Sequence, residues 1–256
     1  SLESHMFDDD GCRRILMRHF KVNTLIGLGV EEFPTGILAA GALLQYLYDT
    51  QKTVLEHFTH ISPYLTSKYM LLDSSTRRNL ELTETLREKQ KRGSLLWVLD
   101  KTKTAMGART LRTMVEQPLI DRAEIEKRHA AIEELNQHVI TREELREYLN
   151  PIYDLERLLS KVTYKTANPR DLIAFRNSLQ MLPPIKTVLA GFQKEELAAI
   201  REEIDGLEDI YQLIDEAIVE EPPISIREGG MIKDQFDETI DHLRAAKHDG
   251  KQWLVQ

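Results

Sequence analysis

The side chains best suited to chemistry in this sequence are one thiol and a few histidines, and their spacing decides what they can do. Cys12 and His19 lie seven residues apart. On a helix this spacing places both on one face but two turns apart, too far for a histidine to activate a thiol. His57 and His60 lie three residues apart, but Pro63 follows and no third ligand is near, whereas a zinc site needs more. We therefore predict neither a nucleophilic pair nor a metal site.

Motifs that cradle phosphates or hold catalytic groups are absent from the sequence. It has no G-x-x-x-x-G-K-[ST] loop, no G-x-S-x-G elbow and no H-E-x-x-H helix. The G-x-G at Gly27 and Gly29 has no clear strand before it and lacks the rest of the dinucleotide fingerprint. Carboxylate doublets such as Glu143-Glu144 fall on polar helix faces, where a solvated surface is the default. We predict no catalytic, cofactor-binding or metal-binding residue in this chain.

Basic residues gather at 87–92 (REKQKR) and at Arg109, Arg112, Lys161 and Lys165. A nucleic-acid interface would place phosphates at such positions. Acids are interleaved with these cations, however, and the chain has a net charge of −8 and a pI near 5.6. A free-standing nucleic-acid-binding domain is usually basic. We interpret these cations as an ordinary solvated surface.

Composition sets the class of protein. The chain has 256 residues, 41% hydrophobic and 30% charged, enough for one large domain or two modest ones. A single cysteine excludes an intrachain disulfide, and no apolar run approaches the roughly 20 residues that span a bilayer. With no signal peptide in the sequence, these features predict a cytoplasmic protein without a membrane partner. We read residues 1–6 (SLESHM) as a tag or cloning remnant.

The elements that would position these side chains are amphipathic helices. Thr35 is a candidate cap for a long helix through about Gln51, whose apolar residues fall on one face. Ala40 and Gly41 on this face would let a neighbouring helix approach closely. Later helices carry the same spacing, with this set of apolar positions: Ile125, Ile132, Leu135, Val139, Leu155, Leu158, Leu159, Val162, Leu172, Phe175, Leu179 and Leu182.

Caps and breakers divide these later helices. Asp121 is a candidate N-cap, and Thr141 to Glu144 has the spacing of a capping box. Asn168-Pro169 supplies an N-cap and a proline for the first helical position. Pro183-Pro184 halts or kinks the chain.

Two short stretches predict strands. Residues 69–73 (YMLLD) are apolar and bounded by polar residues, and residues 224–227 (ISIR) alternate before a glycine turn. We expect the two to pair. A last helix is predicted from about Lys233, and its apolar stripe fades beyond Leu243. The predicted fold class is therefore mainly α: an amphipathic helix bundle with a few short strands and the base of a long lever helix.

The stretch from Leu72 to Leu119 is the most distinctive part of the chain. Asp73 to Thr76 offers several N-caps for a helix that carries Arg77 and Arg78, which leave it about 100° apart. The default interpretation of the pair is a solvated or ion-paired helix face. If the run instead pins the base of the lever helix, at least one of these arginines should be partly buried against a carboxylate or backbone carbonyls. A short apolar helix follows Gly93-Ser94, with Trp97 predicted to lie in the core.

Three blocks together resemble one family. LDSSTRRNLEL, GSLLWVLDKTKTAMGARTLRTMVEQPL and YDLERLLSKVTYKTANPRDLIAFRNSL, in this order and spacing, are similar to the core (lever) domain of the MutS family of DNA mismatch-repair proteins. The resemblance covers about Phe7 to Gln256. We take as its structural signature Arg77, Arg78, Asn79, Glu81, Gly107, Pro118, Pro169 and Arg170.

The resemblance implies a division of labour. Residues 7–34 would be the tail of a connector domain, and residues 35–256 the core domain, reaching about where a DNA clamp begins. The full-length protein would be a DNA-dependent ATPase that uses ATP and magnesium, binds mismatched duplex DNA and pairs with a second MutS subunit. This segment would be a helical relay with no chemistry of its own, and alone it should not bind DNA.

Two alternatives remain from the residues. A helical scaffold for protein partners, unrelated to DNA, would show a large exposed apolar patch. An enzyme with a composite site would show titratable groups with perturbed pKa values converging in a cleft.

Overall fold

The computed structural model describes the chain except for residues 1–3, 52–54, 56–57, 64–65 and 256. The chain forms two compact units, Ser1–Ser67 and Lys68–Gln256. The boundary predicted between residues 34 and 35 separates two domains of the family, whereas the division into units rests on compactness alone. The predicted boundary therefore stays a prediction. His57, one of the histidines considered above, lies outside the described residues.

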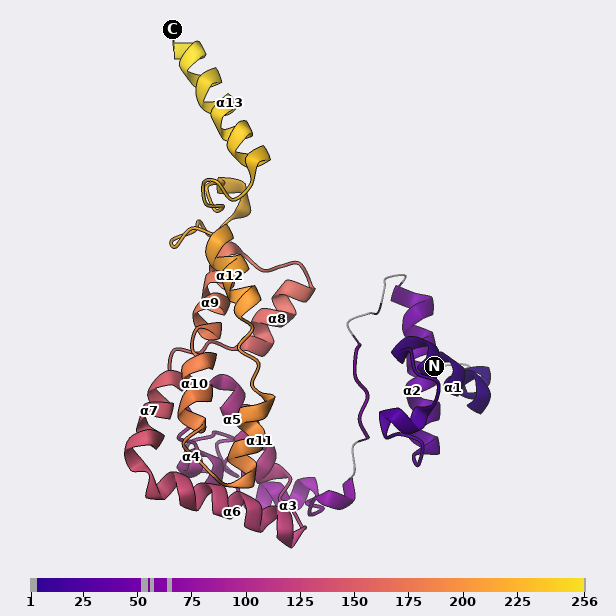
Figure 1. The fold of residues 1–256 in the computed structure, drawn as a ribbon. Coiled ribbons are helices and arrows are strands. Elements are labelled where there is room, and N and C mark those ends of the chain that lie inside the picture. Colours follow the sequence, from indigo (N-terminus) through magenta and orange to yellow (C-terminus); the bar gives the residue numbers. More distant parts are fainter. Residues whose placement is uncertain (1–3, 52–54, 56–57, 64–65, 256) are drawn as a thin grey trace. The chain divides into compact units, whose positions relative to one another are not determined.

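The first unit is built on two helices that cross closely (Figure 1). Its elements are η1 (Ser4–Phe7), α1 (Asp9–Phe20), η2 (Leu25–Leu28) and α2 (Pro34–Gln51). The Asp8 carboxylate caps α1 by accepting from the Gly11 N–H at 2.8 Å. Gly41 faces Cys12 so closely that a Cβ on Gly41 would lie 2.4 Å from the Cys12 Cβ, which confirms the expected close approach.

The second unit is an extended series of helices. They are α3 (Ser74–Asn79), α4 (Leu95–Leu99), α5 (Ala105–Glu116), α6 (Arg122–Gln137), α7 (Val139–Leu149), α8 (Leu155–Thr163), α9 (Pro169–Leu179), α10 (Leu182–Leu189), α11 (Glu195–Glu203), α12 (Glu208–Ala217) and α13 (Glu238–Val255). One short 3₁₀ turn, η4 (Ile226–Glu228), belongs to this unit, and another, η3 (Thr66–Lys68), spans the boundary between the two units. The mainly α fold is therefore confirmed.

Local sequence accounts for most helix starts in this unit. Side-chain caps satisfy the first N–H groups at Asp73, Ser94, Thr104, Asp121, Asp154 and Asn168. At α9 the cap is reciprocal, because Asn168 accepts from the Asp171 N–H while Asp171 accepts from the Asn168 N–H. Pro169 occupies the first turn, as predicted.

Two apolar clusters hold the second unit together. Helices α6, α7, α10 and α11 close around Phe192, Ile185 and Leu189. Helices α8, α9 and α12 close around Phe175, Leu179 and Ile214. Every helix of the described residues is too short or too polar to traverse a lipid bilayer.

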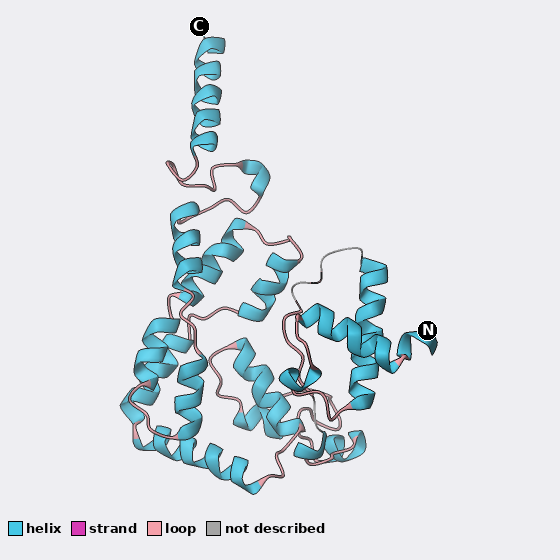
Figure 2. Cartoon of the chain, turned by 45° about the vertical axis from the view of Figure 1, so that its right-hand side comes forward, coloured by secondary structure: helices cyan, strands magenta, loops and turns pink. Residues whose placement is uncertain are grey.

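The two predicted strands are not formed, and their pairing was wrong. Figure 2 draws helices and loops but no strand for the described residues. The extended pairing among them is limited to isolated antiparallel bridges, Tyr69 to Leu119 and Ile218 to Ile232. Residues 226–228 form η4 instead, because the Ser225 hydroxyl and the Glu228 carboxylate cap each other's backbone N–H groups. That reciprocal cap favours a helical turn over the extended chain that alternation predicted.

Other local predictions also failed. Trp97 was expected in the core, but it is 48% exposed. Ile132 and Val139, two of the predicted apolar positions, are exposed as well. Helix α7 begins at Val139 after His138, so Thr141 is interior to the helix rather than its cap. Likewise α2 begins at Pro34, one residue before the expected cap.

Candidate functional site

The first signature residues lie at the end of α3 and do not form a charged cluster. Arg77 is half-buried, whereas Arg78 and Asn79 are exposed. Neither arginine side chain makes an ion pair or hydrogen bond with any described residue, so the expected carboxylate or carbonyl partner is not found. Glu81 is in the left-handed region at φ 47° and organises the turn: its carboxylate accepts from the Leu86 N–H at 2.7 Å.

Gly107 and Pro118 act through the backbone. The Gly107 N–H donates to the Thr104 hydroxyl at 3.0 Å, and a Cβ on Gly107 would lie 3.0 Å from that same oxygen. The Pro118 carbonyl accepts from the Met70 N–H at 2.8 Å. These residues therefore fix the start of α5 and the chain that follows it.

Pro169 and Arg170 lie elsewhere, at the start of α9. Pro169 is buried, and the Arg170 Nε donates to the Pro222 carbonyl at 3.0 Å. The signature residues are thus spread over separate places rather than brought into one site. Their role as a family signature stays a prediction.

An ionic cluster near Arg170 contains the most buried cation among the ion pairs of the described residues. Arg176 of α9 is only 7% exposed and holds two carboxylates. Its guanidinium donates to Asp215 at 2.8 Å and to both oxygens of Glu220, at 2.7 and 2.8 Å. The hydrogen bonds that Arg176 donates to Glu220 raise the pKa of Arg176, and the same contact lowers the pKa of Glu220. We call Arg176, Asp215 and Glu220 the polar joint.

The chain beyond the polar joint is tied back to α12. The Val219 N–H donates to the Met231 carbonyl at 3.0 Å, and the Lys233 N–H donates to the Ala217 carbonyl at 2.8 Å. These bonds flank the Ile218–Ile232 bridge. They hold residues 231–233 in pairing geometry, which explains why α13 begins at Glu238 and not near Lys233 as predicted.

Helix α13 is fastened to this pairing by one arginine. Arg244 donates to the Asp234 carboxylate at 2.7 Å and to the Ile232 carbonyl at 2.7 Å. A continuous series of polar contacts therefore runs from α9, through the polar joint and the bridge, to the start of α13. Bidentate arginine contacts restrict both distance and angle, so they suit a joint whose geometry must be kept.

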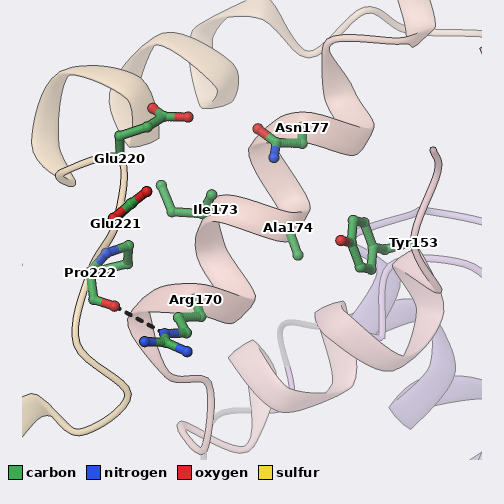
Figure 3. A pocket seen from close by; sticks show the side chains of 8 residues that line it. All are labelled: Tyr153, Arg170, Ile173, Ala174, Asn177, Glu220, Glu221 and Pro222. Carbon is green, nitrogen blue, oxygen red and sulfur yellow. Dashed lines mark hydrogen bonds between the residues drawn. The ribbon is translucent and has the colours of Figure 1, made fainter.

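An open cavity of about 380 Å³ lies beside the polar joint (Figure 3). Its lining residues come from α9, from the segment after α12 and from the loop before α8: Tyr153, Arg170, Ile173, Ala174, Asn177, Glu220, Glu221 and Pro222. A general acid at neutral pH needs a raised carboxyl pKa, but that of Glu220 is lowered. Glu220 therefore stays ionised through its contact with Arg176 and is not suited to the role of a general acid.

Other predicted basic positions are neutralised locally. Arg109 binds Asp154 through two hydrogen bonds of 2.8 Å and also Glu156 at 2.6 Å. The Arg109 guanidinium lowers the pKa of Asp154 to about 2. Arg112 and Lys161 pair with Glu116 and Asp171 respectively. Four of the eight predicted cations, Lys91, Arg109, Arg112 and Lys161, thus have carboxylate partners, whereas the other four, Arg87, Lys89, Arg92 and Lys165, have none among the described residues. In the part of the chain that the structure describes, no cluster of three His, Cys, Asp or Glu side chains could hold a metal.

Sequence reasoning missed Arg176 and Glu134. Glu134 of α6 is buried and accepts from the N–H groups of Gln193 and Lys194 at 2.8 and 3.0 Å, capping α11 from outside. Burial favours a raised pKa for Glu134, but the two N–H groups and nearby positive charge lower it. Arg176 interrupts the apolar face of α9, which was an available signal, whereas Glu134 lies off the apolar face predicted from Ile125, Ile132 and Leu135, so the sequence carried no such signal for it.

The fold and the polar joint define a class: a mainly α-helical module whose last helix is tied to the preceding elements by a series of polar contacts. The family model "MutS domain III" matches residues 75–252, and "MutS domain II" matches residues 3–60. The chain belongs to the MutS family.

Curated relatives agree with this assignment. A DNA mismatch repair protein MutS of Lachnoclostridium phytofermentans is 61% identical over 256 residues, all of this chain and 28% of that relative. A protein of the same name from Ruminiclostridium cellulolyticum is 47% identical over 255 residues, and one from Halothermothrix orenii is 48% identical over 240 residues. The latter two comparisons cover 100% and 94% of this chain but only 29% and 27% of the relatives. The chain thus spans less than a third of the length of these relatives.

Proposed function

We propose that this chain is the helical core of a longer mismatch-repair protein, and that it relays conformational change between a DNA clamp and an ATPase. The observation that carries the proposal is the polar joint, which ties α9 and α12 to the segment from which α13 starts. A helix held at its base by directional ionic contacts turns with the body that holds it. The chain itself performs no chemical step in this proposal.

The proposal is supported by a contrast between two kinds of contact, the apolar packing within the helical body and the ionic contacts of the polar joint. The body is held by apolar packing, which tolerates small shifts poorly and tends to move as a unit. The polar joint adds contacts that depend on orientation, because the planar guanidinium meets Glu220 with two nearly parallel bonds. A displacement of α9 is therefore passed on to the segment after α12 rather than absorbed there.

The whole protein would supply the remaining functions. The relatives are named DNA mismatch repair proteins, so mismatched duplex DNA is the proposed ligand of the full-length protein, which acts in the cytoplasm. From the resemblance, ATP and magnesium are its proposed cofactors, and a second MutS subunit its partner. Magnesium would neutralise the charge that develops on the transferred phosphoryl group.

A titration tests the assignment. Labelled homoduplex and single-mismatch duplex would be titrated against the 256-residue chain and against the full-length protein, at low and physiological salt. We expect no appreciable binding of either duplex by the chain, because its acidic surface cannot neutralise phosphates, and salt-sensitive binding with mismatch preference by the full-length protein. Calorimetry with ATP and magnesium should show no saturable binding by the chain. Tight duplex binding or micromolar nucleotide binding by the chain would overturn the proposal.

A docking role is a second candidate, because α4 presents apolar side chains to solvent. Membership of the MutS family removes the version of this alternative that is unrelated to DNA. It leaves open a partner surface on the same module.

A further inference from the structure

The segment from Asp73 to Lys103 has a charge opposite to that of the rest of the chain. It contains eight Lys or Arg residues and five Asp or Glu residues, within a chain of net charge −8. Two of its carboxylates are engaged in contacts within the segment. Asp73 caps α3, and Asp100 is bound by Lys91 and by the Thr102 hydroxyl, which lowers its pKa to about 2.

Several cations of this segment have no carboxylate partner among the described residues. Arg87, Lys89 and Arg92 are exposed and make no ion pair with any residue that the structure describes, and the same is true of Arg78. Lys91 is the exception, since it binds Asp100. Elsewhere in the second unit some exposed arginines, Arg109 and Arg122 among them, are paired with acids, while Arg157 has no such partner among the described residues.

Apolar side chains are exposed beside these cations. In α4 only Leu96 is buried, at 3% exposure, whereas Trp97 is 48% and Val98 58% exposed. Leu80 and Leu86 are also exposed. They lie near α4 because the Glu81 carbonyl accepts from the Leu95 N–H at 3.0 Å while the Glu81 carboxylate accepts from the Leu86 N–H.

The turn that carries the cations has a defined conformation. The Thr85 N–H donates to the Gln90 carbonyl at 2.9 Å, and the Lys89 N–H donates to the Thr85 carbonyl at 3.1 Å. Gly93 adopts φ 96°, a value that side chains disfavour, with the Thr85 methyl group close by. The cations are therefore presented on a folded turn next to the apolar residues, and not on a loose tail.

We propose that residues 77–99 form a docking surface for an acidic peptide segment of a partner protein, one that also carries apolar side chains. Its carboxylates would pair with Arg87, Lys89 and Arg92, and its apolar side chains would cover Trp97 and Val98. Charge complementarity selects the acidic partner. Nucleic acid fits less well, because single-stranded binding uses several aromatic platforms, whereas the exposed apolar side chains here are mainly Leu and Val.

The test uses the 256-residue chain with Trp253→Phe, so that Trp97 is its only tryptophan. The probe is a synthetic amphipathic peptide with Glu and Asp on one face and Leu and Phe on the other. A second peptide replaces each acid by its amide. Binding is followed by Trp97 fluorescence and by calorimetry. We expect saturable binding of the acidic peptide, weakened by salt, and at least about tenfold weaker binding of the amide peptide.

Matched variants assign the surface. Arg87→Glu, Lys89→Glu and Arg92→Glu together should weaken acidic-peptide binding about tenfold or more, whereas reversal of the exposed Arg14, Arg18 and Arg157 should leave it unchanged. Circular dichroism would confirm that both variants fold, and the corresponding glutamine variants would replace any that does not. Equal binding of both peptides, equal loss in the control variant, or tighter binding of duplex DNA than of the acidic peptide would overturn the proposal.

Discussion

Arg176 and Glu220, forty-four positions apart, meet through two hydrogen bonds of 2.8 and 2.7 Å that join α9 to the segment after α12. The buried member of the pair is the arginine, while the Glu220 side chain is largely exposed. The contact therefore restricts the orientation of the segment without enclosing two charges. This arrangement suits a joint that must keep its geometry while its outer side remains in water.

Removal of Arg176 should destabilise the second unit. A hydrogen bond to a charged group typically contributes about 1.5–3 kcal/mol, and we expect Arg176→Ala to cost about this much, because the Asp215 and Glu220 carboxylates left behind are already largely in water. Urea melts would measure the loss. The matched control is Arg122→Ala, whose side chain is 90% exposed in a pair with Glu126 and should cost about 0.5 kcal/mol or less. Equal midpoints for the two variants would contradict the role of the polar joint.

Acid should weaken the contact between Arg109 and Asp154. The pKa of Asp154 is lowered from 3.8 to about 2 by Arg109, so its ionised form is favoured in the folded state. Its stabilising effect is thus present above about pH 4 and is lost as the pH falls toward about 2. The difference in melting temperature between the wild type and Asp154→Asn should shrink over this window. A difference that stays constant from pH 6 to pH 2 would show that Asp154 acts only as an uncharged helix cap.

The close crossing of α1 and α2 should reject a methyl group at Gly41. Gly41→Ala would place a Cβ 2.4 Å from the Cys12 Cβ, and overpacking of this kind typically costs about 1–3 kcal/mol. Gly36→Ala in the same helix is the control, because its Cβ would meet only the Phe33 Cβ at 3.4 Å. That change should be neutral or stabilising. Amide hydrogen exchange in α1 and α2 would distinguish the two, and equal protection in both variants would refute the close approach.

Loss of the Glu134 carboxylate should loosen the start of α11. Glu134→Ala leaves the N–H groups of Gln193 and Lys194 without their acceptor, so the first turn of α11 should exchange its amide hydrogens faster. The neighbouring Glu133 is exposed, and Glu133→Ala should leave that exchange unchanged. If exchange in α11 is the same in both variants, the buried carboxylate does not hold this helix end.

The sequence predicted those features that depend on neighbouring residues. Asp121 and Asn168-Pro169 were identified as helix starts because a cap acts within one turn, and the structure confirms both. The prediction that Trp97 lies in the core was wrong, because burial depends on which helix covers α4. An apolar stretch of five residues carries no information about that. The strand predicted at residues 224–227 was wrong, because the reciprocal cap between Ser225 and Glu228 outweighed the alternation of apolar and polar residues. That cap was visible in the sequence.

The polar joint could not be predicted for a similar reason. Arg176 lies next to Phe175 on an apolar face, which marks it as unusual, but its partners are 39 and 44 positions away. No local rule pairs residues at that distance. The family resemblance pointed to other residues, of which Arg170 alone lies beside the joint, through its bond to the Pro222 carbonyl.

The relay proposal is tested most directly by breaking the polar joint in the full-length protein. Arg176→Lys keeps the charge but cannot form the planar two-carboxylate contact, and Arg122→Ala is the control. Basal ATP hydrolysis, duplex affinity and the stimulation of hydrolysis by mismatched duplex would be measured for each, with melts to confirm folding. We predict that Arg176→Lys retains basal hydrolysis and duplex affinity but loses most of the stimulation, while the control retains all three. Full stimulation in a folded Arg176→Lys protein would contradict the relay.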